Sequence, residues 1–316
     1  MQTLILPADA QGIATACEWL TLGQPVAIPT ETVYGLAADA RNGEAVARIY
    51  AAKGRPSFNP LIVHVPGLAE AERYVHLGDQ ARLLAEAFWP GPLTMILPLR
   101  DDSGIASITT AGLRTLGVRI PSHPAALAIL RAFDGPLAAP SANPSGRISA
   151  TSAAHVADEV TGLGGRIPAV VDAGACSVGV ESTIIGWSEA GEPALLRPGG
   201  LPAEAIEAVL GCALLRPELN PEAPTSPGQL SSHYAPAVPV RLDAETALPG
   251  ETYLAFGPGA LTLSASRDLT EAAANLFDLL RRADELGRPI AVAPIPEEGL
   301  GVAINDRLRR AAAPRP

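Results

Sequence analysis

Short apolar runs alternate with helix-like segments from residue 4 to about residue 211, and this alternation limits the chain to a layered α/β architecture. The runs that predict strands are residues 3–6, 25–29, 61–65, 94–99, 117–120, 137–139, 169–172, 183–187 and 194–197. The stretches that predict helices are residues 10–22, 43–52, 77–88, 124–133, 151–160 and 202–210. We therefore expect one α/β domain over residues 1–211, built around a mainly buried sheet.

A proline-rich stretch separates this region from a second, smaller one. Prolines at 217, 221, 224, 227, 236 and 239 interrupt any regular pattern, so residues 212–239 are expected to form a semi-extended linker. After the linker, the runs that predict strands are 240–242, 252–256 and 290–293, and those that predict helices are 270–286 and 303–312. A small C-terminal α/β domain is therefore predicted over residues 240–316.

Charge and composition exclude several classes of protein. The net charge of −10 argues against a protein that binds nucleic acid by bulk electrostatics, although it is compatible with a small basic site. Cys17, Cys176 and Cys212 lack the paired spacing of metal sites and are interpreted as reduced thiols, which favours a cytoplasmic location. The chain has no signal-like opening and no apolar run of about 18 residues, so neither export nor membrane spanning is expected.

Lys53 is the only lysine among 23 basic side chains. An ammonium at this one position suggests chemistry that a planar guanidinium does not perform, and the alternative is a surface lysine retained by chance in an arginine-rich chain. The glycine and prolines that follow it disfavour a continued helix, so residues 53–60 are predicted to be extended, with Lys53, Arg55, Ser57 and Asn59 on one face. A face of donors without a carboxylate suits a triphosphate or a small oxyanion. The alternative is a solvated turn between a helix and the next strand.

Two further polar segments follow predicted strands. Thr30 and Thr32 stand where a strand ends, a common ligand position in α/β folds, but a β-branched strand edge would show the same residues. Ser141 and Asn143 lie in a loop that leads to a predicted helix N-terminus near Ser149. Such loops bind anions through backbone N–H groups, although ordinary turn chemistry also favours these residue types.

The remaining candidates are individually weak. Ser182 directly precedes an apolar run, and Arg197 ends another one before two glycines, where it could contact either phosphate or solvent. His233 and Tyr234 are unusual for a flexible spacer, so residues 226–236 are predicted to form an ordered strap on a nucleotide or on plain protein surface. The chain has no phosphate-binding P-loop, dinucleotide fingerprint, paired His/Cys spacing or nucleophile elbow.

These segments, in this order, resemble the YrdC-like family, in particular its long, two-domain threonylcarbamoyl-AMP synthases. The matching stretches are 29–36 (PTETVYGL), 53–60 (KGRPSFNP), 89–94 (WPGPLT), 118–121 (VRIP), 140–146 (PSANPSG), 182–185 (STII), 196–200 (LRPGG), 226–236 (SPGQLSSHYAP) and 299–312 (GLGVAINDRLRRAA). The Lys-x-Arg-x-Ser-x-Asn pattern is highly specific. The resemblance covers most of the chain, although the small C-terminal domain is short for the family.

The resemblance implies a YrdC-like twisted mixed sheet flanked by helices, with a concave positive cavity, and a small Rossmann-like C-terminal domain. It implies an adenylyl-transferring enzyme that condenses L-threonine, bicarbonate or CO2, and ATP into threonylcarbamoyl-AMP and pyrophosphate. The product would pass to proteins that transfer threonylcarbamoyl groups to tRNA. Mg²⁺ is expected with ATP, without an identified protein ligand, and strong direct nucleic-acid binding is not expected.

Site residues follow from the matching motifs. The predicted threonine contacts are Thr32, His64, Arg119 and Ser182. The predicted nucleotide contacts are Arg55, Ser57, Asn59, Thr115, Ser141, Asn143, Ser149, Arg197 and Tyr234. Lys53 and Arg55 are the predicted catalytic residues, because fixed cations would stabilise the anionic carbamate and phosphate oxygens.

Two other functions remain open on the sequence. A YrdC-like module could bind a nucleotide or RNA without turnover, although the acidic net charge weighs against RNA. Another carbamoyl-handling transferase could use the same domain with a different amine or acyl donor. Such enzymes usually carry additional catalytic or zinc-finger domains, and this chain has no cysteine pairs for a zinc finger.

Overall fold

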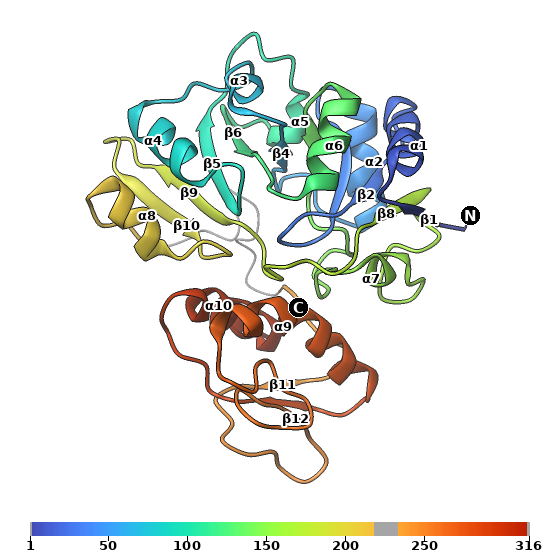
Figure 1. Ribbon diagram of the computed structural model, residues 1–316, viewed down its shortest axis with the longest axis vertical. Helices are drawn as coiled ribbons and strands as arrows, with labels where there is room; N and C mark the ends of the chain where they lie inside the picture. Colours follow the sequence, from blue (N-terminus) through green and yellow to red (C-terminus); the bar gives the residue numbers. More distant parts are fainter. Residues whose placement is uncertain (1, 218–232, 315–316) are drawn as a thin grey trace.

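The structure, a computed structural model, describes residues 2–217 and 233–314 and has two parts (Figure 1). The strands of the first part are β1 (Leu4–Pro7), β2 (Val26–Ile28), β3 (Gly35–Asp39), β4 (Ile62–His64), β5 (Leu93–Pro98), β6 (Thr115–Arg119), β7 (Leu137–Ala138), β8 (Ala169–Asp172), β9 (Thr183–Trp187) and β10 (Pro193–Arg197). They form one sheet in the order β1-β8-β2-β3-β7-β4-β6-β5-β9-β10. The sheet is mixed: β4 and β6 are parallel, whereas β5 and β6 are antiparallel.

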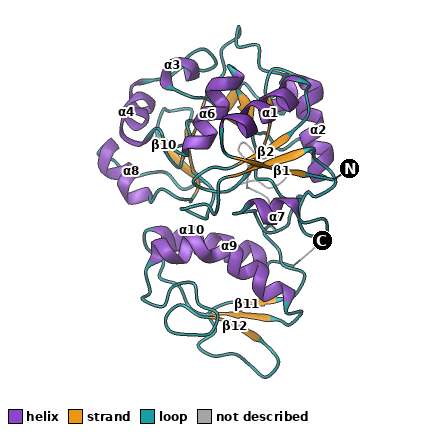
Figure 2. Ribbon diagram, turned by 45° about the vertical axis from the view of Figure 1, so that its right-hand side comes forward, coloured by secondary structure: helices purple, strands orange, loops and turns teal. Residues whose placement is uncertain are grey.

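Helices flank this sheet (Figure 2). They are α1 (Ala10–Thr21), α2 (Gly43–Lys53), α3 (Leu68–Ala71), α4 (Asp79–Phe88), α5 (Ser107–Thr110), α6 (Pro124–Phe133), α7 (Ala153–Ala157) and α8 (Ala203–Leu210). Capping side chains mark where several helices begin. For example, the Asn42 side chain accepts hydrogen bonds from two backbone N–H groups in the first turn of α2. Buried aliphatic residues from the strands and helices form the core of this part.

The C-terminal region is a separate small layer. Its strands are β11 (Val240–Arg241), β12 (Thr252–Leu254) and β13 (Ile290–Val292), and its helices are α9 (Leu269–Glu285) and α10 (Leu300–Ala312). The strands form a parallel sheet in the order β11-β13-β12. Figures 1 and 2 show α9 and α10 between this sheet and the first part of the molecule. The two helices therefore provide the surface that faces the ten-stranded sheet.

The predicted α/β architecture is confirmed, and most elements lie where the sequence pattern predicts them. The strands predicted at 169–172 and 183–187 coincide with β8 and β9. The pattern missed β3, because its sequence Gly-Leu-Ala-Ala-Asp consists mainly of small residues that have low strand propensity. The predicted linker falls largely on residues 218–232, which lie outside the described residues.

The prediction that the chain is extended from Lys53 onward is wrong. Helix α2 continues through Lys53, and Gly54 ends it in the left-handed conformation, with φ of 62°. Glycine suits this position because it lacks the Cβ that makes a left-handed residue costly. Lys53 therefore projects from the last turn of a helix, and it does not share an extended face with Arg55.

Candidate active site

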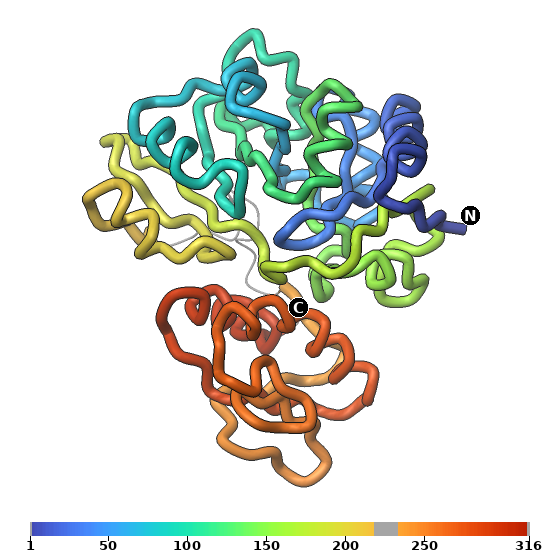
Figure 3. The backbone as a smooth tube through the Cα atoms, in the orientation of Figure 1, coloured from blue at the N-terminus to red at the C-terminus, as the bar shows by residue number. Residues whose placement is uncertain are grey.

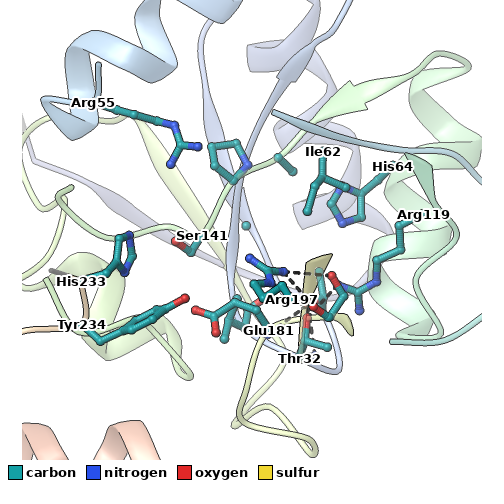
Figure 4. A pocket seen from close by; sticks show the side chains of 16 residues that line it. Thr32, Arg55, Ile62, His64, Arg119, Ser141, Glu181, Arg197, His233 and Tyr234 are labelled. Carbon is teal, nitrogen blue, oxygen red and sulfur yellow. Dashed lines mark hydrogen bonds between the residues drawn. The ribbon is translucent and has the colours of Figure 1, made fainter. Parts of the chain in front are cut away.

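One pocket brings together side chains from distant segments of the chain (Figure 4). Its lining comes from the loop between β2 and β3, the segment after α2, β4, the end of β6, the loop after β7, the segments around β9 and β10, and residues 233–234. Its empty volume, including space open to solvent, is about 590 Å³. Charged, polar and aromatic side chains converge on this space, which is typical of a small-molecule site.

The predicted threonine contacts lie together at one end of the pocket. His64 and Arg119 are register partners on the parallel strands β4 and β6. The Arg119 Nη1 donates to Thr32 Oγ1 over 2.8 Å, and its Nε donates to a backbone carbonyl. Ser182 lies 2.7 Å from Thr94, measured between the two hydroxyl oxygens. All four side chains line this one pocket, and their role as threonine contacts stays a prediction.

A buried ion pair that the sequence did not indicate supports this cluster. The Glu31 carboxylate lies 2.6 Å from Arg119 Nη2, and the two side chains are only 7% and 4% exposed. Burial alone would raise the pKa of Glu31, but the Arg119 charge and hydrogen bond lower it below its usual value. Glu31 therefore stays ionised and holds the Arg119 guanidinium in place.

His64 is a neutral imidazole in this environment. Burial, and then the positive charge of Arg119, lower the pKa of His64 to about 3. Its Nδ1 is buried without a hydrogen-bond partner among the described residues. A neutral imidazole can donate one hydrogen bond and accept another, so it can bind an uncharged polar group without placing a second positive charge beside Arg119.

The side of the pocket away from Arg119 and His64 carries Arg55 and Tyr234, and Arg197 lies between the two groups (Figure 4). All three, together with Ser141, are predicted nucleotide contacts and line the pocket. Burial lowers the pKa of both Arg55 and Arg197 to about 10, so each remains charged at neutral pH. The Arg197 Nη2 donates to the Ser182 carbonyl over 2.8 Å, which links the two ends of the pocket. Fixed guanidinium groups of this kind suit phosphate oxygens.

Glu181 is the main pocket residue that the sequence analysis did not assign. It accepts hydrogen bonds from Ser149 Oγ at 2.6 Å and from Arg307 Nε at 2.8 Å. Burial alone would raise the pKa of Glu181, but Arg307, Arg197 and the Ser149 hydrogen bond lower it to about 2. Arg307 belongs to α10 and is fully buried, so this ion pair joins the C-terminal region to the pocket.

Tyr234 is also held by the C-terminal region. Its ring stacks on Phe277 of α9 with centroids 5.3 Å apart, and the Arg307 guanidinium carbon lies 5.4 Å from its centroid. His233, beside it, also lines the pocket. Residues 226–232 of the predicted strap lie outside the described residues, so the structure places only its last four residues.

Family models match nearly the whole chain. One, described as telomere recombination and covering Sua5, YciO and YrdC proteins, matches residues 18–199, and one described as the C-terminal domain of threonylcarbamoyl-AMP synthase matches residues 201–313. A threonylcarbamoyl-AMP synthase of Bacillus subtilis is 41% identical over 96% of this chain and 93% of the relative. One of Pyrococcus abyssi is 38% identical over 96% and 94%. The chain belongs to the threonylcarbamoyl-AMP synthase family.

Solved structures agree with this assignment. The crystal structure of P. abyssi Sua5 complexed with L-threonine has a TM-score of 0.89 and 37% identity, and the match covers 98% of both chains. Escherichia coli YciO has a TM-score of 0.53 and 22% identity over 63% of this chain, which supports the fold alone. As a threonylcarbamoyl-AMP synthase family member, the chain is a transferase.

The structure does not place Lys53 among the described residues that line the pocket of this synthase fold. Its side chain is 3% exposed, and its Nζ donates to the carbonyls of Ser141 and Asn143, each at 2.5 Å. Burial, and then the charge of Arg55, lower its pKa well below the usual value. The amine thus contacts the loop that carries predicted nucleotide contacts of the family.

Five other predicted nucleotide contacts are likewise not among the described lining residues; these are Ser57, Asn59, Thr115, Asn143 and Ser149. Ser57 is exposed, and Thr115 lines a separate small cavity at the far end of β6. Asn143 donates to two carbonyls within its own loop, and Ser149 contacts Glu181. Asn143 and Ser149 thus contact residues of the pocket wall or of its loop, whereas Ser57 and Thr115 lie away from the pocket. The roles of all five as nucleotide contacts stay predictions.

Within residues 2–217 and 233–314, no three His, Cys, Asp or Glu side chains are grouped closely enough to hold a metal ion. The carboxylates beside the pocket, Glu31 and Glu181, are already paired with arginines. The described residues therefore do not fit a metal held by protein ligands alone. No helix in the described part of the chain is long and apolar enough to cross a membrane.

Proposed function

We propose that this chain condenses L-threonine, bicarbonate or CO2, and ATP into threonylcarbamoyl-AMP and pyrophosphate, for threonylcarbamoyladenosine formation in tRNA. The observation that carries the proposal is the pairing of two clusters in one pocket. The cluster around Arg119, Thr32 and His64 suits an amino acid, and the cluster around Arg55, Arg197 and Tyr234 suits a nucleotide. A pocket with both clusters can hold the two reactants side by side.

At the amino-acid end, Arg119 receives the threonine carboxylate, because its guanidinium is fixed by Glu31 and Thr32. Thr32 and Ser182 offer hydroxyls that orient the amino acid. The neutral ring of His64 takes a hydrogen bond with the side-chain hydroxyl. This arrangement leaves the threonine amine free to react with CO2 or with bicarbonate.

The chemistry has two bond-forming steps. The neutral amine attacks CO2 and loses a proton to give a carbamate. If it attacks bicarbonate instead, the N–H proton and the departing hydroxide leave together as water. A carbamate oxygen then bonds to the α-phosphorus of ATP while the bond from that phosphorus to the pyrophosphate oxygen breaks. Both steps need alignment more than a protein nucleophile, and alignment of bound reactants can supply about 7–11 kcal/mol.

Arg55 and Arg197 neutralise negative charge at the nucleotide end. Both guanidinium groups are charged at neutral pH and anchored through backbone carbonyls, Arg55 to Pro60 at 3.1 Å and Arg197 to Ser182 at 2.8 Å. Donors that are fixed in advance stabilise developing charge without having to reorganise. Lys53 acts here as a positioning residue, because it holds the loop of Ser141 and Asn143.

Mg²⁺ would enter with ATP, bound to phosphate oxygens and water rather than to a protein cage. The adenylate is a mixed anhydride and would pass to proteins that transfer the threonylcarbamoyl group to tRNA. A cytoplasmic location remains a prediction from the cysteine content.

The direct test is pyrophosphate release by the purified chain with ATP, Mg²⁺ and bicarbonate. We expect release that depends on both L-threonine and bicarbonate, with little release when the amino acid is omitted. ATP binding without any threonine-dependent pyrophosphate would contradict the proposed function.

A further inference from the structure

Strand β4 divides its side chains between the core and the pocket. Leu61 and Val63 belong to the largest hydrophobic cluster, together with Val65. Ile62 and His64 alternate with them and both line the pocket. Ile62 is 7% exposed, yet none of the three hydrophobic clusters formed by the described residues includes it. Its apolar surface is therefore turned to the pocket rather than used in the core.

The neighbours of Ile62 place it at the amino-acid end. On the adjacent strand β6, Gly117 is the register partner of Ile62, and Arg119 is that of His64. Figure 4 shows Ile62 beside His64 and on the same side of the pocket as Arg119. The Ile62 carbonyl accepts a hydrogen bond from Ala139 N at 2.9 Å, which fixes the backbone from the β7 side.

Gly117 leaves Ile62 room to lie over β6. A Cβ at that position would come within 3.6 Å of Ile62 Cγ1 and within 3.2 Å of Ile96 Cδ1. Val33, the other branched aliphatic residue in the lining, belongs instead to the cluster that contains Tyr234. Of these two aliphatic side chains, only Ile62 stays outside the hydrophobic clusters of the described residues, and it lies beside His64.

We infer that Ile62 receives the side-chain methyl group of L-threonine and so sets the preference for threonine over serine. This inference rests on the proposed function. The carboxylate and hydroxyl that Thr32, His64, Arg119 and Ser182 would bind are common to both amino acids, and so is the free amine, so these polar contacts cannot separate them. Only the methyl group differs, and a single methyl in an apolar site typically gives roughly 10–200-fold discrimination.

The test compares kcat/KM for L-threonine and L-serine in pyrophosphate release by the full chain. Ile62→Ala should lower the threonine-to-serine ratio about tenfold, mainly through weaker use of threonine, with serine nearly unchanged. Ile62→Val should give a smaller fall in the same direction. Val33→Ala is the matched control, because it shortens the other branched aliphatic side chain of the lining, which packs in the cluster that contains Tyr234. It should leave the threonine-to-serine ratio at the wild-type value.

Several outcomes separate this inference from the proposed function. An unchanged ratio in Ile62→Ala, with threonine-dependent release still measurable, overturns the inference and leaves the proposed function standing. An equal fall in Val33→Ala also overturns it, because the effect would then be general. If Ile62→Ala does not fold, calorimetric binding of both amino acids to Ile62→Val decides the question. No threonine-dependent release by the wild type removes the proposed function, and the inference with it.

Discussion

At the scale of single residues, Lys53 acts through the loop it holds. Its buried ammonium donates to two carbonyls of the Ser141–Asn143 segment, and a compact ammonium can approach both. Burial depresses its pKa, so the two carbonyls and the surrounding charges together decide how firmly it keeps its proton. The lone lysine is thus explained by a geometry that a guanidinium fork does not fit.

We predict that Lys53→Ala lowers kcat/KM, because two buried carbonyls of the Ser141–Asn143 loop lose their donor, and a buried acceptor left without a partner typically costs about 1–3 kcal/mol. Lys53→Arg should also be impaired, because the planar fork does not fit between the two carbonyls. The apparent KM for ATP should rise in both variants as the loop loosens. Pyrophosphate release measures kcat and the apparent KM for ATP. Near-normal values in both variants would show that Lys53 does not support the reaction.

Glu181 makes stability depend on pH in a defined direction. Its pKa in the folded chain is about 2, below the usual value of 4.5, so its contribution is present above about pH 4.5. That contribution is lost as pH falls from about 4.5 toward 2. We predict that denaturant unfolding of the wild type loses more stability over this window than Glu181→Gln does. Parallel losses in the two proteins would show that this carboxylate is not held ionised by Arg307.

At the scale of elements, the end of the strap is held by helices α9 and α10. Tyr234 lies between Phe277 and Arg307, so the strap residues at the pocket are fixed by the C-terminal region. We predict that deletion of residues 226–236 weakens ATP binding while the first part of the molecule stays folded. Calorimetry with ATP and circular dichroism measure the two effects, and unchanged ATP affinity would reject a role for the strap in nucleotide binding.

The helices and strands show which parts of the fold the sequence pattern could predict. Apolar runs such as β8 and β9 were found because β-branched residues mark buried strands. The small residues of β3 gave no such signal. The sequence also did not show that Gly54 adopts the left-handed conformation, so the continuation of the helix through Lys53 was missed. Motif segments indicated most of the pocket lining, since each segment keeps its polar residues together.

Long-range pairs could not be predicted in the same way. Glu181 and Arg307 stand 126 positions apart, and Glu31 and Arg119 belong to segments that meet only in the folded sheet. Nothing local in either sequence segment identifies the partner. The pocket position of Ile62 could not be predicted either. In the sequence it is one aliphatic residue of an apolar run, and only the folded strand shows that its side chain lines the pocket.

At the scale of the whole molecule, the C-terminal region contacts segments that border the pocket. Figure 3 shows its red and orange tube beside the yellow-green segments of the first part. Arg281 of α9 donates to the Ile148 and Ser149 carbonyls at 2.6 and 3.4 Å, and Arg307 of α10 reaches Glu181 and the Pro198 carbonyl. Two buried arginines therefore fix segments that carry predicted nucleotide contacts.

We predict that Arg307→Met raises the apparent KM for ATP while threonine binding changes little. Removing one partner of a buried ion pair typically costs about 3–5 kcal/mol, so the unfolding free energy should fall as well. Arg309→Ala is a suitable control, because Arg309 lies on the same helix with a side chain that is 55% exposed and paired with an exposed Glu297. Equal effects on ATP and threonine would show that the contact supports general folding only.

The central claim is that one pocket joins threonine, a one-carbon anion and the adenylyl group of ATP. Mass spectrometry of the product formed from carbon-13-labelled bicarbonate tests this most directly. We predict a threonylcarbamoyl-adenylate that carries the carbon-13 label and forms together with pyrophosphate. A product without the label, or an adenylate formed in the absence of threonine, would contradict the account.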